Sequence, residues 1–282
     1  MKKILTLIAA ALIACVSCVS FGANGNWNSK KIRGNGHVVI QYRDVQGFSK
    51  IKAGNALTVI ISQGSKDSVV VEADDNLQEH IFTELDGEYL RIYADANFDN
   101  SKKIVRVTYK MIDGLDVSSA ASLVSKSVIN CSSLEIEVSS AATITAEVET
   151  KDTRVEASSA ATCNIYGKLA YATLNASSAA TINVDRLTCG KITAETSSAA
   201  TINIDGTAGV LNATSSSAST INASDLKADD CELEASSGSS IHANAKNTIN
   251  AEVSSGANIT YRGTPQVKHQ KTSSGGSLEQ VD

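Results

Sequence analysis

The pentapeptide Ser139-Ser140-Ala141-Ala142-Thr143 decides the fold, because it returns along the chain at a nearly constant spacing. The same or closely related pentapeptides begin at Ser118, Ser139, Ser158, Ser177, Ser197, Ser216, Ser236, Ser254 and Ser273. Successive copies are 21, 19, 19, 20, 19, 20, 18 and 19 residues apart. A period of this kind is the signature of a repeat protein, in which each repeat forms one unit that stacks on its neighbours.

The residues around each copy show the alternation of a β-strand. In the second copy, Ile136 and Val138 are apolar and flank Glu137, and most other copies repeat this order. Such alternation is typical of a strand with one buried face. Five residues after the first Ser a second apolar column follows, formed by Leu123, Ile144, Cys163, Ile182, Ile202, Ile221, Ile241, Ile259 and Leu278. Each repeat therefore contains at least two short strands, joined by a Ser-Ser-Ala-Ala segment where we expect only small side chains to fit.

The period and the alternation together select one fold class. Leucine-rich repeats have a similar period but require a Leu-x-x-Leu-x-Leu pattern, and helical repeats are longer. Aromatic residues make up only 4% of the chain, which favours a thin and regular β-structure. The sequence predicts an all-β, single-stranded, right-handed parallel β-helix (a β-solenoid) with coils of about 19–20 residues. Equivalent residues of successive coils would stack about 4.8 Å apart.

The first 22 residues have the composition of an export signal. Lys2 and Lys3 precede an apolar run over residues 4–14, which is too short to span a bilayer. Two processing routes fit the sequence. Residues 12–15 resemble a lipobox, in which Cys15 would be lipidated, whereas the small residues up to Gly22 would suit ordinary cleavage after that glycine.

The remaining chain is predicted to form one domain. Residues 23–35 would be an N-terminal linker, and residues 36–282 a single β-helix. Within it, residues 116–282 carry the regular Ser-Ser-Ala/Gly repeats, while residues 36–115 are β-rich without the repeat. We interpret residues 36–115 as irregular first coils that cap the end of the solenoid; a separate small β-domain is the alternative.

Catalytic and cofactor chemistry finds little support in the sequence. His37, His80, His242 and His269 lie in different sequence neighbourhoods, and no serine has a nucleophile-elbow context. The four cysteines beyond the signal, Cys131, Cys163, Cys189 and Cys231, lack metal-ligand spacing and are predicted to be small buried side chains. A net charge of −5 without a basic stripe argues against nucleic-acid binding. The sequence therefore predicts a non-enzyme without a cofactor.

Several short stretches outside and inside the repeats resemble a known bacterial family, the putative auto-transporter adhesin, head GIN domain. The stretches that carry the resemblance are Arg43-Asp44-Val45, Phe48, Ile51, Val59, Gln63-Gly64, Val70-Val71-Glu72, Asp75-Asn76-Leu77, Leu90-Arg91-Ile92, Gly263-Thr264-Pro265 and Ser273-Ser274-Gly275-Gly276. The resemblance covers residues 36–282 and implies a single-stranded parallel β-helix on an exported or lipoprotein-like protein. It implies no particular functional residue.

One outward column of the predicted strands is rich in carboxylates. The residues two positions before the first Ser are Asp116, Glu137, Glu156, Asn175, Glu195, Thr214, Glu234 and Glu252. At a spacing of about 4.8 Å, neighbouring charges repel by roughly 1 kcal/mol in water. The column must therefore face solvent or hold a cation, and we name Glu137, Glu156, Glu195, Glu234 and Glu252 as candidates for a weak cation stripe. Paired glycosidase-like carboxylates are a third interpretation, which lacks aromatic sugar platforms.

A second pair of outward columns forms a Thr-x-Asn pattern around the inner Ile column. Its members are Thr143, Thr162, Thr181, Asn183, Thr201, Asn203, Thr220 and Asn222. These rows suit a glycan- or protein-binding face. Thr and Asn ladders also stabilise stacked coils by hydrogen bonding alone, and the pattern loosely resembles the flat face of ice-binding β-helices, so three interpretations stay open.

These features favour an exported cell-envelope or cell-surface binding or adhesion module that presents flat polar ladders to a glycan or protein partner. A structural periplasmic or envelope protein without a diffusible ligand is the second interpretation, and a polysaccharide-acting β-helix enzyme the third. The protein would be located at the outer membrane, the cell surface or the periplasm, with membrane contact only through a lipid on Cys15. The exposed edge of a terminal coil would permit a homo-oligomer.

Overall fold

The computed structural model describes residues 31–99 and 101–281. The predicted signal peptide, the lipidation candidate Cys15 and most of the predicted linker lie outside these residues. The described chain is nearly all β, with a single short 3-10 helix. It includes no helix with the length and apolar character that a membrane span requires.

The strands follow one another closely along the chain. In order, the elements are β1 (Lys31–Ile32), β2 (Val38–Arg43), β3 (Lys50–Ala53), β4 (Thr58–Gln63), β5 (Ser68–Asp74), the 3-10 helix η1 (Asp75–His80), β6 (Ile81–Asp86), β7 (Tyr89–Ala94), β8 (Asn97–Phe98), β9 (Lys103–Tyr109), β10 (Gly114–Val117), β11 (Ser122–Ser125), β12 (Ile129–Val138), β13 (Thr143–Ala157), β14 (Thr162–Ala176), β15 (Thr181–Thr196), β16 (Thr201–Ser215), β17 (Thr220–Ala235), β18 (Ser240–Val253), β19 (Asn258–Arg262), β20 (Gln266–Thr272) and β21 (Ser277–Gln280).

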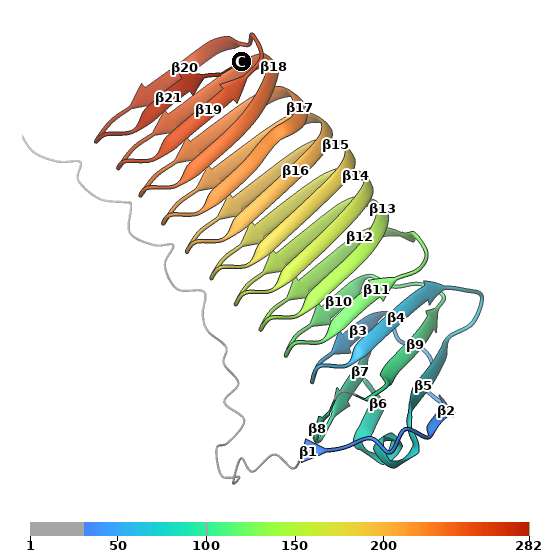
Figure 1. The fold of residues 1–282 in the computed structure, drawn as a ribbon. Helices are drawn as coiled ribbons and strands as arrows, with labels where there is room; N and C mark the ends of the chain where they lie inside the picture. The colour runs from blue at the N-terminus through green and yellow to red at the C-terminus, as the bar shows by residue number, and fades with distance from the viewer. Residues whose placement is uncertain (1–30, 100, 282) are drawn as a thin grey trace, which may run out of the picture. The chain divides into compact units, whose positions relative to one another are not determined.

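From β10 onward the chain winds as a parallel β-solenoid, which confirms the predicted fold class (Figure 1). Each long strand pairs in parallel with the next, so equivalent residues of successive repeats become neighbours. Ile144, Cys163 and Ile182 stack in this register, and all three are fully buried. The inner columns therefore form one continuous core of small and aliphatic side chains, which explains how a domain with so few aromatics buries enough surface.

The Ser-Ser-Ala-Ala segment forms a tight turn at one corner of every coil. Its second and third residues both have positive φ, for example 53° at Ser140 and 60° at Ala141. The N–H of Ala142 donates to the C=O of Ser139, which closes the turn. The N–H of Ala141 donates to the C=O of Ser159 in the next coil, so the hydrogen-bond ladder continues around the corner. Two successive left-handed residues characterise a type I′ turn.

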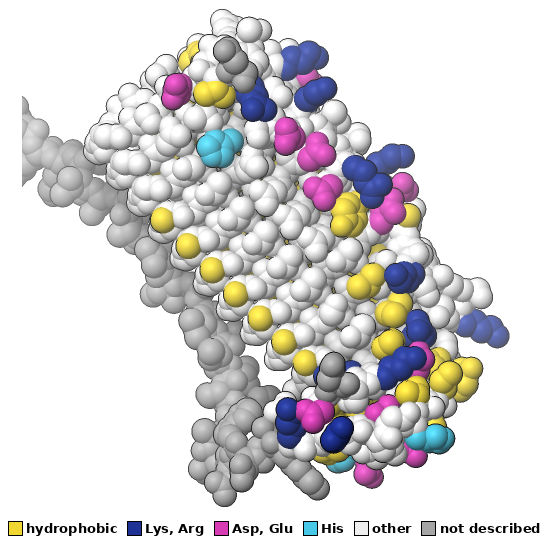
Figure 2. Space-filling view, viewed as in Figure 1, with side chains coloured by type: hydrophobic (Ala, Val, Ile, Leu, Met, Phe, Trp, Pro, Cys, Tyr) yellow, Lys and Arg dark blue, Asp and Glu magenta, His cyan; other side chains and the backbone are white. Residues whose placement is uncertain are grey.

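The two alanine positions of the turn require small residues for different reasons. The second Ala, such as Ala142, is buried in the core. The first Ala is exposed, and at the equivalent Gly238 an added Cβ would meet no atom within 4 Å. A small residue stands there because left-handed backbone strains side chains that branch at Cβ, rather than because neighbours crowd it. Figure 2 shows the resulting single file of small hydrophobic side chains along one edge of the coils.

Residues 38–109 combine two kinds of pairing. β3 and β4 pair in parallel with β10 and β11, and β7 and β9 continue the same two sheets. In contrast, β5 pairs antiparallel with β2 and β9, and β6 pairs antiparallel with β7. Antiparallel strands cannot belong to a regular coil, so this part closes the end of the solenoid with a cap that has its own topology.

The cysteines of the described chain are all free. Cys163, Cys189 and Cys231 are buried, which confirms that they serve as small core side chains, whereas Cys131 is only half-buried. Burial raises the pKa of both Cys163 and Cys231 to about 12. At neutral pH these thiols are protonated and chemically inert.

Candidate functional site

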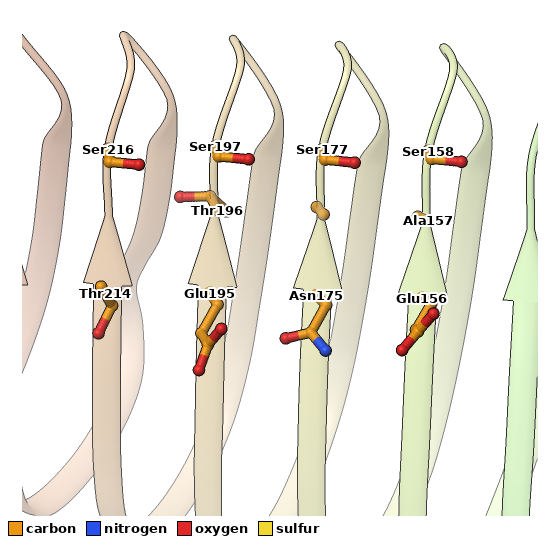
Figure 3. Close-up of a pocket in the computed structure, with 11 residues that line it drawn as sticks. Glu156, Ala157, Ser158, Asn175, Ser177, Glu195, Thr196, Ser197, Thr214 and Ser216 are labelled. Carbon is orange, nitrogen blue, oxygen red and sulfur yellow. The ribbon is translucent and has the colours of Figure 1, made fainter. Parts of the chain in front are cut away.

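A groove follows the solenoid beside the Ser-Ser corner (Figure 3). It has a volume of about 370 Å³ and crosses four successive coils. One wall is the predicted carboxylate column and the other is the row of first serines. The residues that line it are Glu156, Ala157, Ser158, Asn175, Ala176, Ser177, Glu195, Thr196, Ser197, Thr214 and Ser216.

Strand alternation produces the groove. Glu195 points outward on β15, the next residue Thr196 points inward, and Ser197 points outward again at the turn. The same order in the neighbouring coils leaves a depression over the inward-pointing residues. The hydroxyls of the labelled serines point the same way, so the groove presents hydrogen-bonding groups at each coil (Figure 3). The repeat signal predicted these serines only as turn residues and missed their place in the wall.

Parallel register brings the whole carboxylate column together as predicted. Asp116 pairs with Glu137, Glu137 with Glu156, and the row continues through Glu234 to Glu252. Both ends of the row are neutralised by the chain itself. The column runs on to Lys52, whose Nζ lies 2.5 Å from Asp116 Oδ2, and to Lys271, whose Nζ lies 3.0 Å from Glu252 Oε2.

The middle of the column lacks this neutralisation. Glu156 has an ion pair with Arg154, but no cationic side chain of the described residues lies within ion-pair distance of Glu195 or Glu234. Asn175 and Thr214 replace carboxylates at two positions of the row, and this lowers the repulsion. Within residues 31–99 and 101–281, no three His, Cys, Asp or Glu side chains converge in a metal-binding cluster.

Position along the column changes the carboxyl pKa. Burial, followed by repulsion from Asp116, Glu135 and Glu156, raises the pKa of Glu137 above its ordinary value. The hydrogen bond from Lys271 is the main cause that lowers the pKa of Glu252. The pKa of Glu137 therefore lies above the ordinary glutamate value, and the pKa of Glu252 lies below it.

We expect Glu137→Gln to raise the thermal midpoint at neutral pH. A carboxyl whose pKa is higher in the folded state loses stability as the pH rises from its unfolded pKa through its folded pKa. Removing the charge of Glu137 therefore stabilises the folded state at pH values above its folded pKa. The gain in stability disappears in acid, where Glu137 is protonated. Calorimetry at neutral and acidic pH measures the effect. Glu252→Gln is the matched control of opposite sign, because it removes a charge that Lys271 stabilises, and a gain from both variants would contradict the account.

Among the described residues that line the groove, Asn175 has the one buried side-chain polar atom without a hydrogen-bond partner. Its Oδ1 is buried and has no hydrogen-bond partner among the described residues. In Figure 3 this oxygen points toward the coil of Glu195, and the amide nitrogen points toward the coil of Glu156. Both Asn175 Oδ1 and an ionised Glu195 are acceptors only. A buried acceptor without a donor costs about 1–3 kcal/mol, so this pair favours a ligand that donates.

The parallel register also stacks the Thr-x-Asn rows, which lie after each Ser-Ser turn, whereas the carboxylate column lies before it. Thr143, Thr162, Thr181, Thr201 and Thr220 stack in one row, and Asn183, Asn203 and Asn222 lie in the second, all of them half-buried. The asparagine amides bond to one another along the axis. Asn183 Nδ2 donates to Asn164 Oδ1 at 2.8 Å, and Asn203 Nδ2 donates to Asn183 Oδ1 at 2.8 Å. The amide donors of Asn183 and Asn203 are therefore already hydrogen-bonded within the protein.

A buried hydroxyl cluster lies under the groove. Thr196 Oγ1 donates to Ser215 Oγ at 2.9 Å, and Ser219 Oγ lies 2.9 Å from both oxygens. These three residues occupy positions where most other coils place alanine or another apolar residue, and the mutual bonds satisfy them. The sequence alone did not distinguish this cluster from the small core residues around it.

A family model for the putative auto-transporter adhesin, head GIN domain, matches residues 47–205 and 170–265. The chain belongs to this family. The earlier resemblance is thereby confirmed, and the matched segments include both the cap and the regular coils. The head GIN domain family is described as putative adhesins, and this description assigns no residue to the role.

Solved structures share the fold of this head GIN domain protein. A putative adhesin from Parabacteroides merdae aligns with a TM-score of 0.69 at 18% identity, over 89% of this chain and 99% of the other. A putative adhesin from Parabacteroides distasonis gives 0.69 at 21% identity, over 89% and 100%. A putative lipid binding protein from the same organism gives 0.64 at 19% identity, over 90% and 100%. No curated protein matches the chain. At these identities the likeness establishes the fold only.

Proposed function

We propose that the protein is an exported binding module of the cell envelope or cell surface, and that the groove beside the Ser-Ser corner is its binding site. The buried and unpaired Asn175 Oδ1 carries this proposal, because it is an acceptor in the lining of the groove and its neighbour Glu195 is also an acceptor. A ligand that supplies hydrogen-bond donors would satisfy them together.

The chemical groups of the groove limit the classes of partner that can bind there. Hydroxyl groups of a glycan, or the ammonium and guanidinium groups of a protein, are donors that suit carboxylate, amide and serine oxygens. Each coil repeats the same groups, so an extended partner would make one shallow contact per coil and gain affinity from their number. The adhesin description of the family supports this mode of binding. The proposal includes export by residues 1–22, with lipidation at Cys15 or cleavage after Gly22 as the two routes.

The Thr-x-Asn face is a less suitable surface for the same role. Its asparagine donors and acceptors pair along the solenoid, so a ligand would have to compete with bonds that already exist. A stiffening role between coils accounts for this ladder without a ligand.

The test is binding of the purified protein to arrays of glycans and host extracellular proteins, followed by titration of any hit. In Asn175→Leu the acceptor is lost, and in Glu195→Lys an introduced ammonium fills the hollow. We expect each variant to weaken binding by about tenfold or more, which corresponds to the loss of about one charge-assisted hydrogen bond.

Matched controls lie on the opposite face. Thr181→Leu and Thr201→Lys change half-buried positions of the Thr-x-Asn rows in the same coils, and they should leave the affinity unchanged. Binding that survives the groove variants but is lost in these controls would move the site to the Thr-x-Asn face. Absence of any hit on either array would favour the second interpretation, a structural envelope protein without a diffusible ligand.

A further inference from the structure

Strand β2 is an open edge of the cap. Among the described residues it pairs with β5 alone, and Figure 1 shows it at the outer side of the cap. An exposed edge presents unpaired N–H and C=O groups that another strand can bind.

Backbone alternation shows which residues of β2 face outward. The N–H of Asp75 donates to the C=O of His37 at 3.0 Å, so residues 37, 39 and 41 direct their backbone groups toward β5. The backbone groups of Val38, Ile40 and Tyr42 therefore face the open edge. Their side chains are exposed by 41%, 60% and 80% and lie together on one face of the sheet. Figure 2 shows hydrophobic side chains gathered on this side of the cap.

Other open edges of the described chain carry charges that discourage pairing. β20 pairs only with β18 and contains Lys268 and Lys271, and β6 pairs only with β7 and contains Glu84 and Asp86. Charged residues are the usual protection of an edge strand. In β2, residues 38–42 contain no charge at all, so this edge lacks the protection that β20 and β6 have.

We propose that a second copy of this chain pairs with β2, antiparallel and related by a two-fold axis at Ile40. The axis at Ile40 places Ile40 opposite Ile40 of the partner and Val38 opposite Tyr42, and all three of these side chains are apolar or aromatic. The interface is then self-complementary, as a two-fold dimer requires. It creates a continuous apolar row with an aromatic opposite a β-branched residue, and no like charges meet across residues 38–42.

The size of this contact predicts a weak dimer. One six-residue strand and three exposed side chains from each copy fall below the 1,200–2,000 Å² or so that a stable interface buries. The dimer should therefore form in a concentration-dependent way. The inference does not depend on the groove, since β2 lies in the cap and the groove lies on residues 156–216.

Sedimentation equilibrium of the full mature protein tests the proposal. We expect the wild type to change from monomer to dimer as its concentration rises, and Tyr42→Lys to weaken association by about tenfold or more, since it places a charge opposite Val38 of the partner. The double variant Val38→Glu with Tyr42→Lys should restore the dimer, because the introduced carboxylate and ammonium then face each other across the two-fold axis.

Two further variants keep the result independent of folding. Ile40→Pro removes an N–H that points to the open edge, so it should abolish the dimer while circular dichroism stays unchanged. Val39→Pro removes an N–H that bonds to β5 and should disturb the cap itself. Three results would each overturn the proposal. The wild type could stay monomeric up to its solubility limit, or the double variant could associate as weakly as Tyr42→Lys. The third is that β2 of the wild type pairs only with a strand of another protein.

Discussion

Gly206→Ala should destabilise the solenoid by about 2–4 kcal/mol, the range of backbone strain combined with a steric clash. Gly206 has φ of +131°, a region that only glycine adopts without strain. A Cβ on it would lie 2.2 Å from the carbonyl oxygen of Leu187 and 2.6 Å from its nitrogen. Both contacts are with backbone of the preceding coil, which cannot turn aside. Chemical unfolding of the purified variant measures the loss.

Gly206 lies opposite a bulge in the neighbouring coil, and Gly167 has the same close approach, to Val148, opposite a coil without a bulge. The register between β15 and β16 shifts between Val184 and Leu187, and Arg186 has a positive φ of 54°. This coil contains one of the 20-residue intervals, between Ser177 and Ser197, so the bulge absorbs an extra residue. Gly206 lies directly opposite and allows the backbones to approach.

Gly238→Ala is the matched control. Gly238 also has positive φ, at 68°, but an added Cβ would meet nothing within 4 Å, and equivalent turns already carry alanine. We expect a change of less than about 1 kcal/mol there. Equal losses at Gly206 and Gly238 would contradict the explanation, because they would show that positive φ alone, without the clash, sets the cost.

The second large effect is expected from the inner column. Ile182 is fully buried between Cys163 and Ile202 of the adjacent coils. Ile182→Ala removes three carbons from a site that rigid neighbouring coils prevent from collapsing, and it should cost about 2–5 kcal/mol. Urea unfolding followed by circular dichroism gives the shift in free energy.

The adjacent residue provides the comparison for Ile182. Asn183→Ala changes the outward column and removes hydrogen bonds to Asn164 and Asn203, which should cost about 1 kcal/mol for each bond. Both variants lie in the same coil, so the difference between them separates core packing from the ladder. A larger loss at Asn183 than at Ile182 would mean that the ladder, and not the core, holds the coils together.

The sequence was sufficient to predict the regular coils because their signal repeats. Each copy of the pentapeptide reports the same register, so the stacking of Glu137 on Glu156 and of Thr162 on Thr181 followed from alignment alone. Strand alternation then fixed which columns face solvent. Both inferences depended only on contacts between copies of the repeat.

Two of the features that escaped prediction occur only once, whereas the third, the left-handed turn, recurs in every copy of the repeat. The antiparallel pairing of β5 with β2 and β9 depends on contacts between segments without a shared motif. The unpaired Oδ1 of Asn175 depends on the orientation of one side chain in its row. The left-handed turn was hidden because alanine and serine, rather than the glycines that usually mark such backbone, occupy most of its copies.

The central claim, a binding module that faces the outside of the cell, is tested most directly by labelling one cysteine on intact cells. Ala179 is exposed at the turn, where the equivalent glycines have open space, so Ala179→Cys adds an accessible thiol without a clash. The test is made in a Cys131→Ser background, which removes the half-buried thiol and leaves only the buried Cys163, Cys189 and Cys231 among the described residues. A membrane-impermeant maleimide should then label the Ala179→Cys variant on intact cells well above its Cys131→Ser parent. Labelling that appears only after lysis, with a periplasmic control protein behaving the same way, would place the solenoid inside the envelope and contradict the surface role.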